Sequence, residues 1–389
     1  MSKKSFVIII LVIIFGVFIF VPIKEVLIRI GAVTMYRGDN WKINRKTKDP
    51  VYDKVIGIET DIENRFNNYF PFHDKINSLY FNTNTSVDSL YSKYIYLKDD
   101  SDNEHLFLDK ENNLYYLVSQ YSGSELDERM NNQVEFYNDI KNKYPDIDLM
   151  LYLPLRYSET SFKNINGVHD KIMDFTTKLD SNIKVNVFDN KSVDEYLKYY
   201  YRTDHHYNSY GAEKAYLDIL NSYGLSNNLN TTHKTIRDKY YGSMAKGTLS
   251  TKIGDKLTAI DTKVILGTNI NDEKFKPLTI NENSNPFYDY FVVYFNGQYD
   301  EIIYTNKSSY NRNLLIISDS MAWQIDYLLA NNFDKTYVVN MKYGKWVKND
   351  LDLDSYIKDN NITHILFLRE TKNIVFDADN FKLDERVVR

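Results

Sequence analysis

The chain has 389 residues, 43% of them hydrophobic and 26% charged, which is enough to build one large domain or two modest ones. The net charge is −5 with both signs spread along the sequence, so no basic block marks a nucleic-acid partner. The absence of cysteine excludes disulfides, thiolate zinc sites and cysteine nucleophiles.

A long apolar run lies close to the N-terminus. Residues 6–23 carry no charge, and as a helix rising ~1.5 Å per residue they would span about 27 Å, close to the ~30 Å core of a bilayer. The run is longer than the apolar core of a signal peptide, and no small-residue cleavage site follows it. We predict an uncleaved single-pass anchor over residues 1–24, with a cleaved signal peptide as the alternative. Lys3 and Lys4 favour a cytoplasmic N-terminus, which places the remaining chain outside the cell membrane.

The chain after this run is predicted to begin with a linker. Residues 25–57 include a polar stretch with glycine, proline and many charges, which is typical of a stalk. The predicted domain covers residues 58–389. Near its start, residues 106–118 alternate like a hairpin, and residues 126–143 have the spacing of an amphipathic helix.

From residue 147 onward the pattern alternates between strands and helices. Short buried strands are expected at 147–155, 183–188, 314–317, 336–339 and 364–368. Helices are expected at 162–179 with a break near Gly167, from Ser192, and at 211–223, 322–330 and 354–359. This alternation predicts an α/β fold, with helices on both faces of a mostly parallel sheet. Residues 228–311 fit less well, and we predict a long insertion there with loops near the site.

One polar cluster stands out between two of these helices. Asp204, His205, His206 and Asn208 place an acid, two imidazoles and an amide within five residues. His206 could act as a base, and Asp204 can reach its ring if the segment is extended or turns tightly. A plain loop is an equally open interpretation. A metal site formed by Asp204, His205 and His206 is a further alternative, but no other ligand has an obvious spacing, so no metal or other cofactor is predicted.

A second polar group follows a predicted buried strand. Residues 314–317 run directly into Ser318, Asp319 and Ser320, and a helix is expected near Ala322. In an open parallel sheet, ligands gather at the carboxyl ends of the strands. A serine hydroxyl there could attack an ester with the help of a base, although an ordinary helix cap would look the same.

We interpret the two groups as parts of one catalytic triad. Ser320 would be the nucleophile, His206 the base and Asp204 the acid that orients the base. The backbone N–H of Ser320 is the first candidate for an oxyanion donor, and the Asn208 side chain and the Gly242 backbone are weaker candidates.

The same residues resemble a known family. Thr203-Asp204-His205-His206-Tyr207-Asn208, followed by Gly211-Ala212, resembles the motif of the DHHW family. That family is similar to the periplasmic alginate O-acetylation proteins of the SGNH-hydrolase-like superfamily. Further segments resemble the family in the right order: Phe66–Phe72, Leu106–Tyr115, Tyr240–Ser243 and Leu314–Ser320.

The resemblance implies a three-layer α/β/α domain of the SGNH-hydrolase type. It gives Asp204, His206 and Ser320 the roles of acid, base and nucleophile, with His205 at a variable position. The sequence departs from the family at two positions near these residues, where Tyr207 replaces a tryptophan and Ser318 replaces a glycine. It also has Met341-Lys342-Tyr343 where an arginine before the tyrosine is usual.

The resemblance also implies an activity. Such proteins work beside a membrane-bound O-acyltransferase that delivers acetyl groups across the membrane. The implied function is an O-acetyltransferase that acts on an exported polysaccharide through an acetyl-serine intermediate. A carbohydrate acetylesterase with the same triad is the first alternative, and a non-catalytic, membrane-anchored polysaccharide-assembly protein is the second.

Overall fold

A computed structural model describes residues 94–99, 104–109, 114–118 and 123–388, with gaps at 249–250, 252, 264–266, 270–273, 276–279, 281–285, 296–298, 307–309, 342–345, 347–348 and 378–382. All described residues belong to one unit, Asp88–Arg389. The predicted anchor and stalk lie outside the described residues. Within the described part, no helix is both long enough and apolar enough to cross a bilayer.

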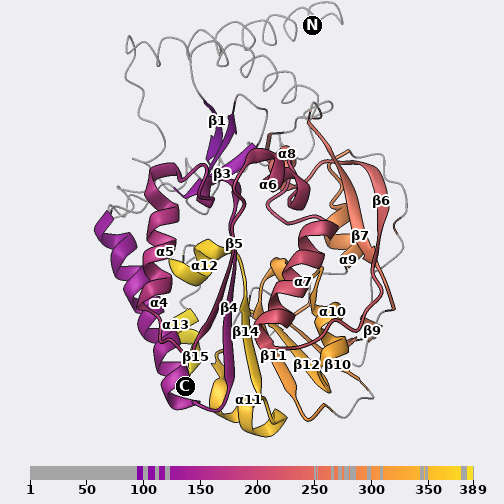
Figure 1. Cartoon of the computed structure of the whole chain (residues 1–389). Coiled ribbons are helices and arrows are strands. Elements are labelled where there is room, and N and C mark those ends of the chain that lie inside the picture. The colour runs from indigo at the N-terminus through magenta and orange to yellow at the C-terminus, as the bar shows by residue number, and fades with distance from the viewer. Residues whose placement is uncertain are drawn as a thin grey trace, which may run out of the picture. The chain divides into compact units, whose positions relative to one another are not determined.

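An eight-stranded sheet forms the centre of this unit, in the order β5-β4-β14-β11-β12-β10-β8-β9 (Figure 1). Its parallel strands are β4 (Asp148–Pro154), β5 (Lys184–Phe188), β11 (Asn313–Ser318), β12 (Lys335–Asn340) and β14 (His364–Leu368). Antiparallel pairing then adds β10 (Glu301–Thr305), β8 (Gly267–Asn269) and β9 (Lys274–Phe275). The predicted α/β class and mostly parallel sheet are therefore confirmed.

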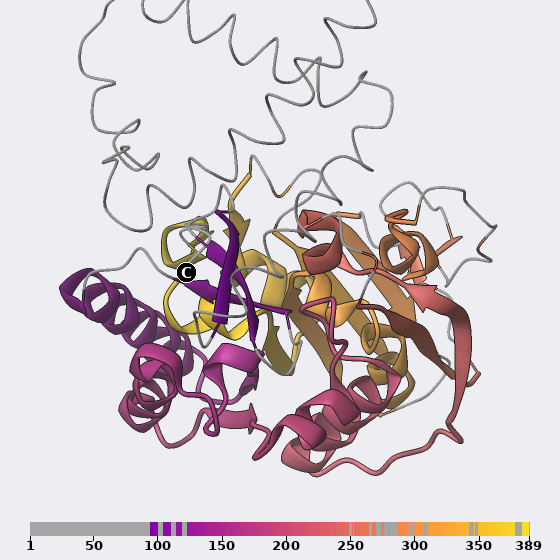
Figure 2. The same ribbon diagram turned by 90° about the horizontal axis from the view of Figure 1, so that it is seen from above.

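Helices cover both faces of the sheet, because alternate strand residues point to opposite sides. On one face, Leu314 and Ile316 join the core beneath α7 (Ser209–Tyr223) and α10 (Asp326–Leu329). On the other face, strand residues including Leu315 pack with α4 (Gly123–Lys143) and α5 (Val168–Lys178). Seen from above, the purple α4 lies at the left, and the orange strands lie at the centre and right (Figure 2).

Smaller elements surround this sheet. Three strands, β1 (Tyr94–Asp99), β2 (Glu104–Asp109) and β3 (Leu114–Val118), form a separate antiparallel sheet that contains the predicted hairpin. Two further pairs are β6 (Thr232–Tyr240) with β7 (Asp255–Asp261), and β13 (Leu351–Asp352) with β15 (Val387–Val388). The remaining α-helices are α6 (Val193–Tyr199), α8 (Ser243–Thr248), α9 (Tyr290–Phe295), α11 (Leu353–Asn360), α12 (Thr371–Val375) and α13 (Leu383–Arg386).

Two helix predictions need correction. The helix expected at 322–330 is interrupted: a 3-10 turn at Ser320–Ala322 precedes α10, and a second 3-10 turn at Ala330–Asn332 follows it. The helix expected at 211–223 begins two residues earlier, because the Asn208 side chain caps it. The break near Gly167 is confirmed by the left-handed φ of +72° at that residue.

Residues 228–311 contribute to both the sheet and the surroundings of the polar cluster. β8, β9 and β10 from this region extend the main sheet beyond β12. The β6–β7 hairpin, α8 and α9 come from the same region and contact the polar cluster and its neighbour Arg202.

One buried carboxyl in the core makes stability depend on pH. Asp326 accepts hydrogen bonds from the Tyr299 hydroxyl at 2.8 Å and the Tyr327 N–H at 2.6 Å, and no Lys or Arg pairs with it among the described residues. Burial raises the pKa of Asp326 to about 7, against an ordinary value of 3.8. Between these values the folded chain holds a proton that the unfolded chain releases. The contribution of Asp326 to stability is therefore largest below about pH 4, and it falls as the pH rises towards 7, by up to about 1.4 kcal/mol per pH unit.

We expect Asp326→Asn to remove this slope, because the amide has no proton to lose in this range. The variant should be more stable than the wild type above pH 7. Urea unfolding at several values between pH 4 and pH 8 measures the effect, with Asp238→Asn as the control, since the Asp238 side chain is 82% exposed. If the Asp326→Asn and Asp238→Asn proteins showed equal slopes, the assignment would be wrong.

Candidate active site

A tight loop between α6 and α7 carries the acid and the two histidines. Its ends are joined by an isolated β-bridge between Tyr200 and Tyr207, and the Asn208 N–H donates to the Tyr199 carbonyl at 2.8 Å. Gly211 allows this approach, since a Cβ there would overlap the Tyr199 carbonyl oxygen and the Tyr207 side chain. We call residues 200–208 the acid–base loop.

Within this loop, the Asp204 carboxylate forms two hydrogen bonds with His206. Asp204 Oδ1 lies 2.6 Å from His206 Nδ1 and also accepts the His206 backbone N–H at 3.1 Å. Both side chains are buried. The sequence prediction that an aspartate two residues before the histidine reaches its ring therefore agrees with the geometry, which is that of an acid orienting a base.

The other oxygen of the Asp204 carboxylate is held from the β6–α8 connection. Asp204 Oδ2 accepts the Tyr240 hydroxyl at 2.7 Å and the Ser243 N–H at 2.8 Å. Burial acts to raise the pKa of Asp204, but His206 and these donors outweigh it and hold the pKa well below its ordinary value. The carboxyl is therefore ionised and able to stabilise a protonated His206.

The outer nitrogen of His206 is available for chemistry. Nε2 is buried and has no hydrogen-bond partner among the described residues. The imidazole stacks on Phe291 with centroids 4.2 Å apart, Trp323 lies 6.3 Å away, and the His205 ring lies 3.9 Å away at an angle of 37°. A base that is fixed at Nδ1 and unpaired at Nε2 can accept a proton at Nε2.

The turn after β11 presents Ser320. Asp319 caps it, with Oδ1 accepting the Met321 N–H at 3.0 Å and Oδ2 accepting the Glu370 N–H at 3.1 Å. Arg369, fully buried, lies 4.0 Å from Asp319 Oδ2. Ser320 itself is half-buried, whereas the hydroxyl of Ser318 points away and donates to the Val339 carbonyl at 3.2 Å. We call residues 318–322 the serine turn.

Hydrogen bonds join the acid–base loop to the segment that begins with the serine turn. The Tyr207 hydroxyl donates to the Met321 carbonyl, and the Gln324 amide donates to the Tyr207 carbonyl. Thus the neighbour of His206 contacts the neighbour of Ser320. No hydrogen bond links Ser320 Oγ to His206 Nε2 among the described contacts, a bond that often forms fully only when substrate is bound.

A buried charge network behind the histidines was not found by sequence reasoning. Glu370 lies 3.3 Å from His205 Nε2, pairs with Arg156 and has the Lys372 ammonium at 3.6 Å. His205 Nδ1 in turn lies 3.0 Å from the Ser243 hydroxyl. Through its backbone Glu370 holds Asp319, and through its side chain it holds His205, so it connects both halves of the site. The signal in the sequence was a pair of charges, Arg369-Glu370, directly after a buried strand.

His205 has a supporting place in this arrangement. Burial and the neighbouring His206 lower the pKa of His205 to about 3, although Glu370 opposes this change. The ring is therefore neutral at ordinary pH and links Ser243 to Glu370.

The two weaker oxyanion candidates are engaged elsewhere. The Asn208 oxygen caps α7 and its Nδ2 donates to the Lys198 carbonyl at 3.0 Å. The Gly242 N–H donates to the Thr203 hydroxyl at 3.1 Å, and a Cβ at this position would overlap Asp204. Because the Asn208 side chain and the Gly242 N–H are both engaged, the Ser320 N–H is the candidate oxyanion donor.

The three residues that could bind a metal lie close together. Asp204, His205 and His206 each offer a ligand atom, all within 4.8 Å of one another. However, His206 Nδ1 is bonded to Asp204, and His205 Nδ1 is bonded to Ser243. An ion would have to displace these hydrogen bonds, which counts against the metal alternative.

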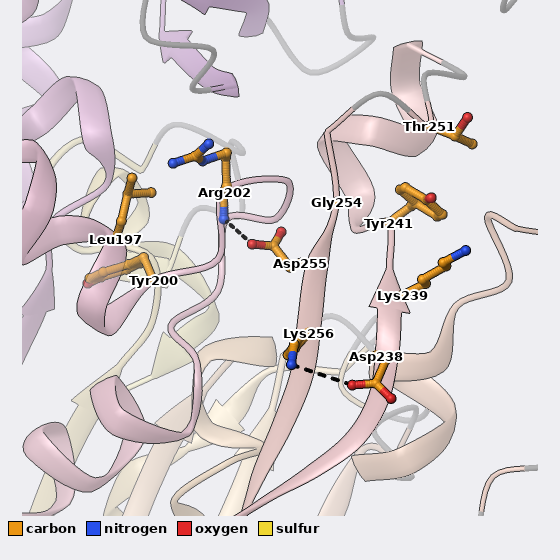
Figure 3. Close-up of a pocket in the computed structure, with 10 residues that line it drawn as sticks. All are labelled: Leu197, Tyr200, Arg202, Asp238, Lys239, Tyr241, Thr251, Gly254, Asp255 and Lys256. Carbon is orange, nitrogen blue, oxygen red and sulfur yellow. Dashed lines mark hydrogen bonds and ion pairs between the residues drawn. The ribbon is translucent and has the colours of Figure 1, made fainter.

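A cavity of about 520 Å³ adjoins the acid–base loop (Figure 3). It is lined by Leu197, Tyr200, Arg202, Asp238, Lys239, Tyr241, Thr251, Gly254, Asp255 and Lys256. The Asp255 carboxylate forms a shared wall, because it accepts the Arg202 N–H at 2.9 Å and both the N–H and the hydroxyl of Thr203, at 2.8 and 2.5 Å. The cavity therefore opens beside the loop, and neither His206 nor Ser320 lines it.

Solved structures share this architecture. Bacillus cereus PatB1 with a sulfonyl adduct has a TM-score of 0.57 and 21% identity, over 72% of this chain and 99% of that chain. A protein from Eubacterium siraeum of the family suggested by the motif has a TM-score of 0.55 and 17% identity, over 75% of this chain and 98% of that chain. The fold is that of a DHHW family protein. The O-acetyltransferase domain of Pseudomonas putida AlgJ is a looser match, with a TM-score of 0.41 and 13% identity over 70% and 92% of the two chains.

The DHHW likeness expected from residues 203–208 is thus confirmed at the level of the fold. No protein-family model and no curated protein matches the sequence. In the DHHW fold of this chain, the motif residues occupy the acid–base loop, and the serine turn follows a central parallel strand.

Proposed function

We propose that this protein transfers an acetyl group through Ser320 to a hydroxyl of an exported polysaccharide, using His206 and Asp204 in an SGNH-type triad. The observation that carries the proposal is the Asp204–His206 pair at 2.6 Å, with His206 Nε2 unpaired beside the segment that carries Ser320. The shared DHHW fold supports the same proposal.

The first step loads the serine. His206 Nε2 removes the proton from Ser320 Oγ, which attacks the carbonyl carbon of an acetyl donor. The ionised Asp204 stabilises the imidazolium that forms. The Ser320 N–H, at the start of the 3-10 turn, stabilises the developing oxyanion. His206 then gives its proton to the leaving group, and an acetyl ester remains on Ser320.

The second step passes the acetyl group to the acceptor. A sugar hydroxyl gives its proton to His206 Nε2 and attacks the acetyl carbon. The bond between carbon and Ser320 Oγ breaks, and Ser320 regains a proton from His206. The product is an O-acetylated sugar and the free enzyme.

The predicted N-terminal anchor suits this chemistry. A membrane-bound O-acyltransferase as the source of acetyl groups would place the donor at the outer surface of the membrane. A catalytic domain tethered to the extracellular side by one helix would meet it there.

The proposal is tested by giving the purified full-length protein an activated acetyl ester, 4-nitrophenyl acetate, and a panel of oligosaccharides. We expect mass spectrometry to show oligosaccharides that gain one acetyl group. Loss of acetyl groups from pre-acetylated oligosaccharides, without any gain, would favour the esterase alternative. Neither change, with no release of 4-nitrophenolate, would favour a non-catalytic assembly protein.

A further inference from the structure

An aromatic ring from outside the motif covers the base. Phe291, on α9, stacks on the His206 imidazole with ring centroids 4.2 Å apart and an interplanar angle of 21°. Its own side chain is only 1% exposed. Phe291 therefore shields one face of the imidazole from solvent.

The ring is held in this position from several directions. Trp323, just after the serine turn, lies 6.0 Å from Phe291 at 31°. Phe295 and Tyr201 contact Phe291 as well, at 4.9 and 6.4 Å between centroids. Because three different elements supply these rings, the tertiary structure holds Phe291 against His206.

The aromatic rings around His206 limit the access of water to the base. His206 Nε2, the atom that must accept a proton from the acceptor, is buried and has no hydrogen-bond partner among the described residues. A water molecule is stable in a buried site only with two or more polar partners. Phe291 and Trp323 offer their apolar faces beside the ring, so water is disfavoured next to the base.

We infer that Phe291 is a specificity-determining residue that favours a sugar hydroxyl over water as the acceptor of the acetyl group. This inference rests on the proposed function. Binding energy from the rest of a sugar chain can bring its hydroxyl to His206, whereas a water molecule has no such source of energy.

The two competing reactions differ only in the nucleophile. In transfer, the sugar oxygen attacks the acetyl carbon and its proton passes to His206 Nε2. In hydrolysis, a water oxygen does the same and acetic acid leaves. In both, the bond from carbon to Ser320 Oγ breaks and Ser320 recovers a proton from His206.

The test measures how one acetyl-enzyme intermediate divides between these products. Wild-type, Phe291→Ala and Phe291→Leu proteins are given 4-nitrophenyl acetate and increasing concentrations of an oligosaccharide that the wild type acetylates. Acetate and acetylated oligosaccharide are then quantified. Their ratio does not depend on how much of the protein is folded, so a purely structural effect would not change it.

Phe175→Ala is the matched control. It removes an equally buried ring from α5, in the core on the opposite face of the sheet, where the new cavity would be lined by apolar groups and would stay dry. The cavity left by Phe291→Ala borders a polar imidazole nitrogen and can admit water.

We expect Phe291→Ala to raise the ratio of acetate to acetylated sugar by about tenfold, Phe291→Leu to raise it less, and Phe175→Ala to leave it near the wild-type value. An unchanged ratio in Phe291→Ala, or an equal rise in Phe175→Ala, would overturn the inference. If Phe291→Ala fails to fold, an unchanged ratio in Phe291→Leu would overturn it equally. Undiminished turnover in Ser320→Ala would instead refute the acetyl-serine proposal itself.

Discussion

Replacing Ser320 by alanine is expected to lower the turnover of 4-nitrophenyl acetate by about 10⁴-fold or more, because a triad loses most of its effect when its nucleophile is removed. The KM for the ester should change little, since the alanine removes only the attacking oxygen. Steady-state release of 4-nitrophenolate measures both quantities. The fold should be unaffected, because Asp319 and not the Ser320 side chain caps the turn.

Ser318→Ala provides the control for this substitution. Ser318 lies in the same turn, but its hydroxyl is buried and donates to the Val339 carbonyl. Losing this bond costs roughly 1 kcal/mol of stability and leaves the chemistry intact. If Ser318→Ala lost as much activity as Ser320→Ala, or if Ser320→Ala stayed within tenfold of the wild type, Ser320 would not be the nucleophile.

Asp204→Asn is expected to lower turnover by about 10³- to 10⁴-fold, because the oxygen that accepts from the His206 ring and from the His206 backbone N–H is lost. The Tyr240 hydroxyl and the Ser243 N–H both donate to Oδ2, so the amide oxygen must take that position. The NH₂ group then faces His206 Nδ1 and acts as the donor. The imidazole must carry its proton on Nε2, where it can no longer accept the proton of Ser320.

Tyr240→Phe separates this effect from a general loosening of the loop. It removes one donor to Asp204 while the Ser243 N–H and the His206 contacts remain. We expect it to lose no more than about tenfold in turnover. Steady-state kinetics of both variants provide the comparison, and similar losses in Asp204→Asn and Tyr240→Phe would contradict the tautomer argument.

The sequence was most informative where local patterns determine structure. The strands β4, β11 and β14 contain continuous apolar runs, and runs of this kind are buried on both faces of a sheet. The Asp204–His206 contact was also predictable, because two residues in a tight loop can meet without help from the remaining chain. The Ser318-Asp319-Ser320 turn followed from its place after a strand.

Sequence reasoning failed where long-range contacts decide the environment. Glu370 reaches His205 only because β14 ends beside β11 in the sheet. Phe291 reaches His206 only because α9 folds back from a region with no clear pattern. Asn208 and Gly242 looked suitable as oxyanion donors, but one caps a helix and the other binds Thr203. Composition and residue spacing do not predict contacts between side chains that are far apart in the sequence.

The most direct test of the acetyl-serine proposal is chemical labelling of Ser320. A sulfonyl fluoride reacts with an activated serine hydroxyl. After treatment with phenylmethylsulfonyl fluoride, intact-protein and peptide mass spectrometry should show one added sulfonyl group, located on Ser320. The group should be absent in Ser320→Ala and greatly reduced in His206→Asn. Labelling elsewhere, or equal labelling of all three proteins, would contradict the account.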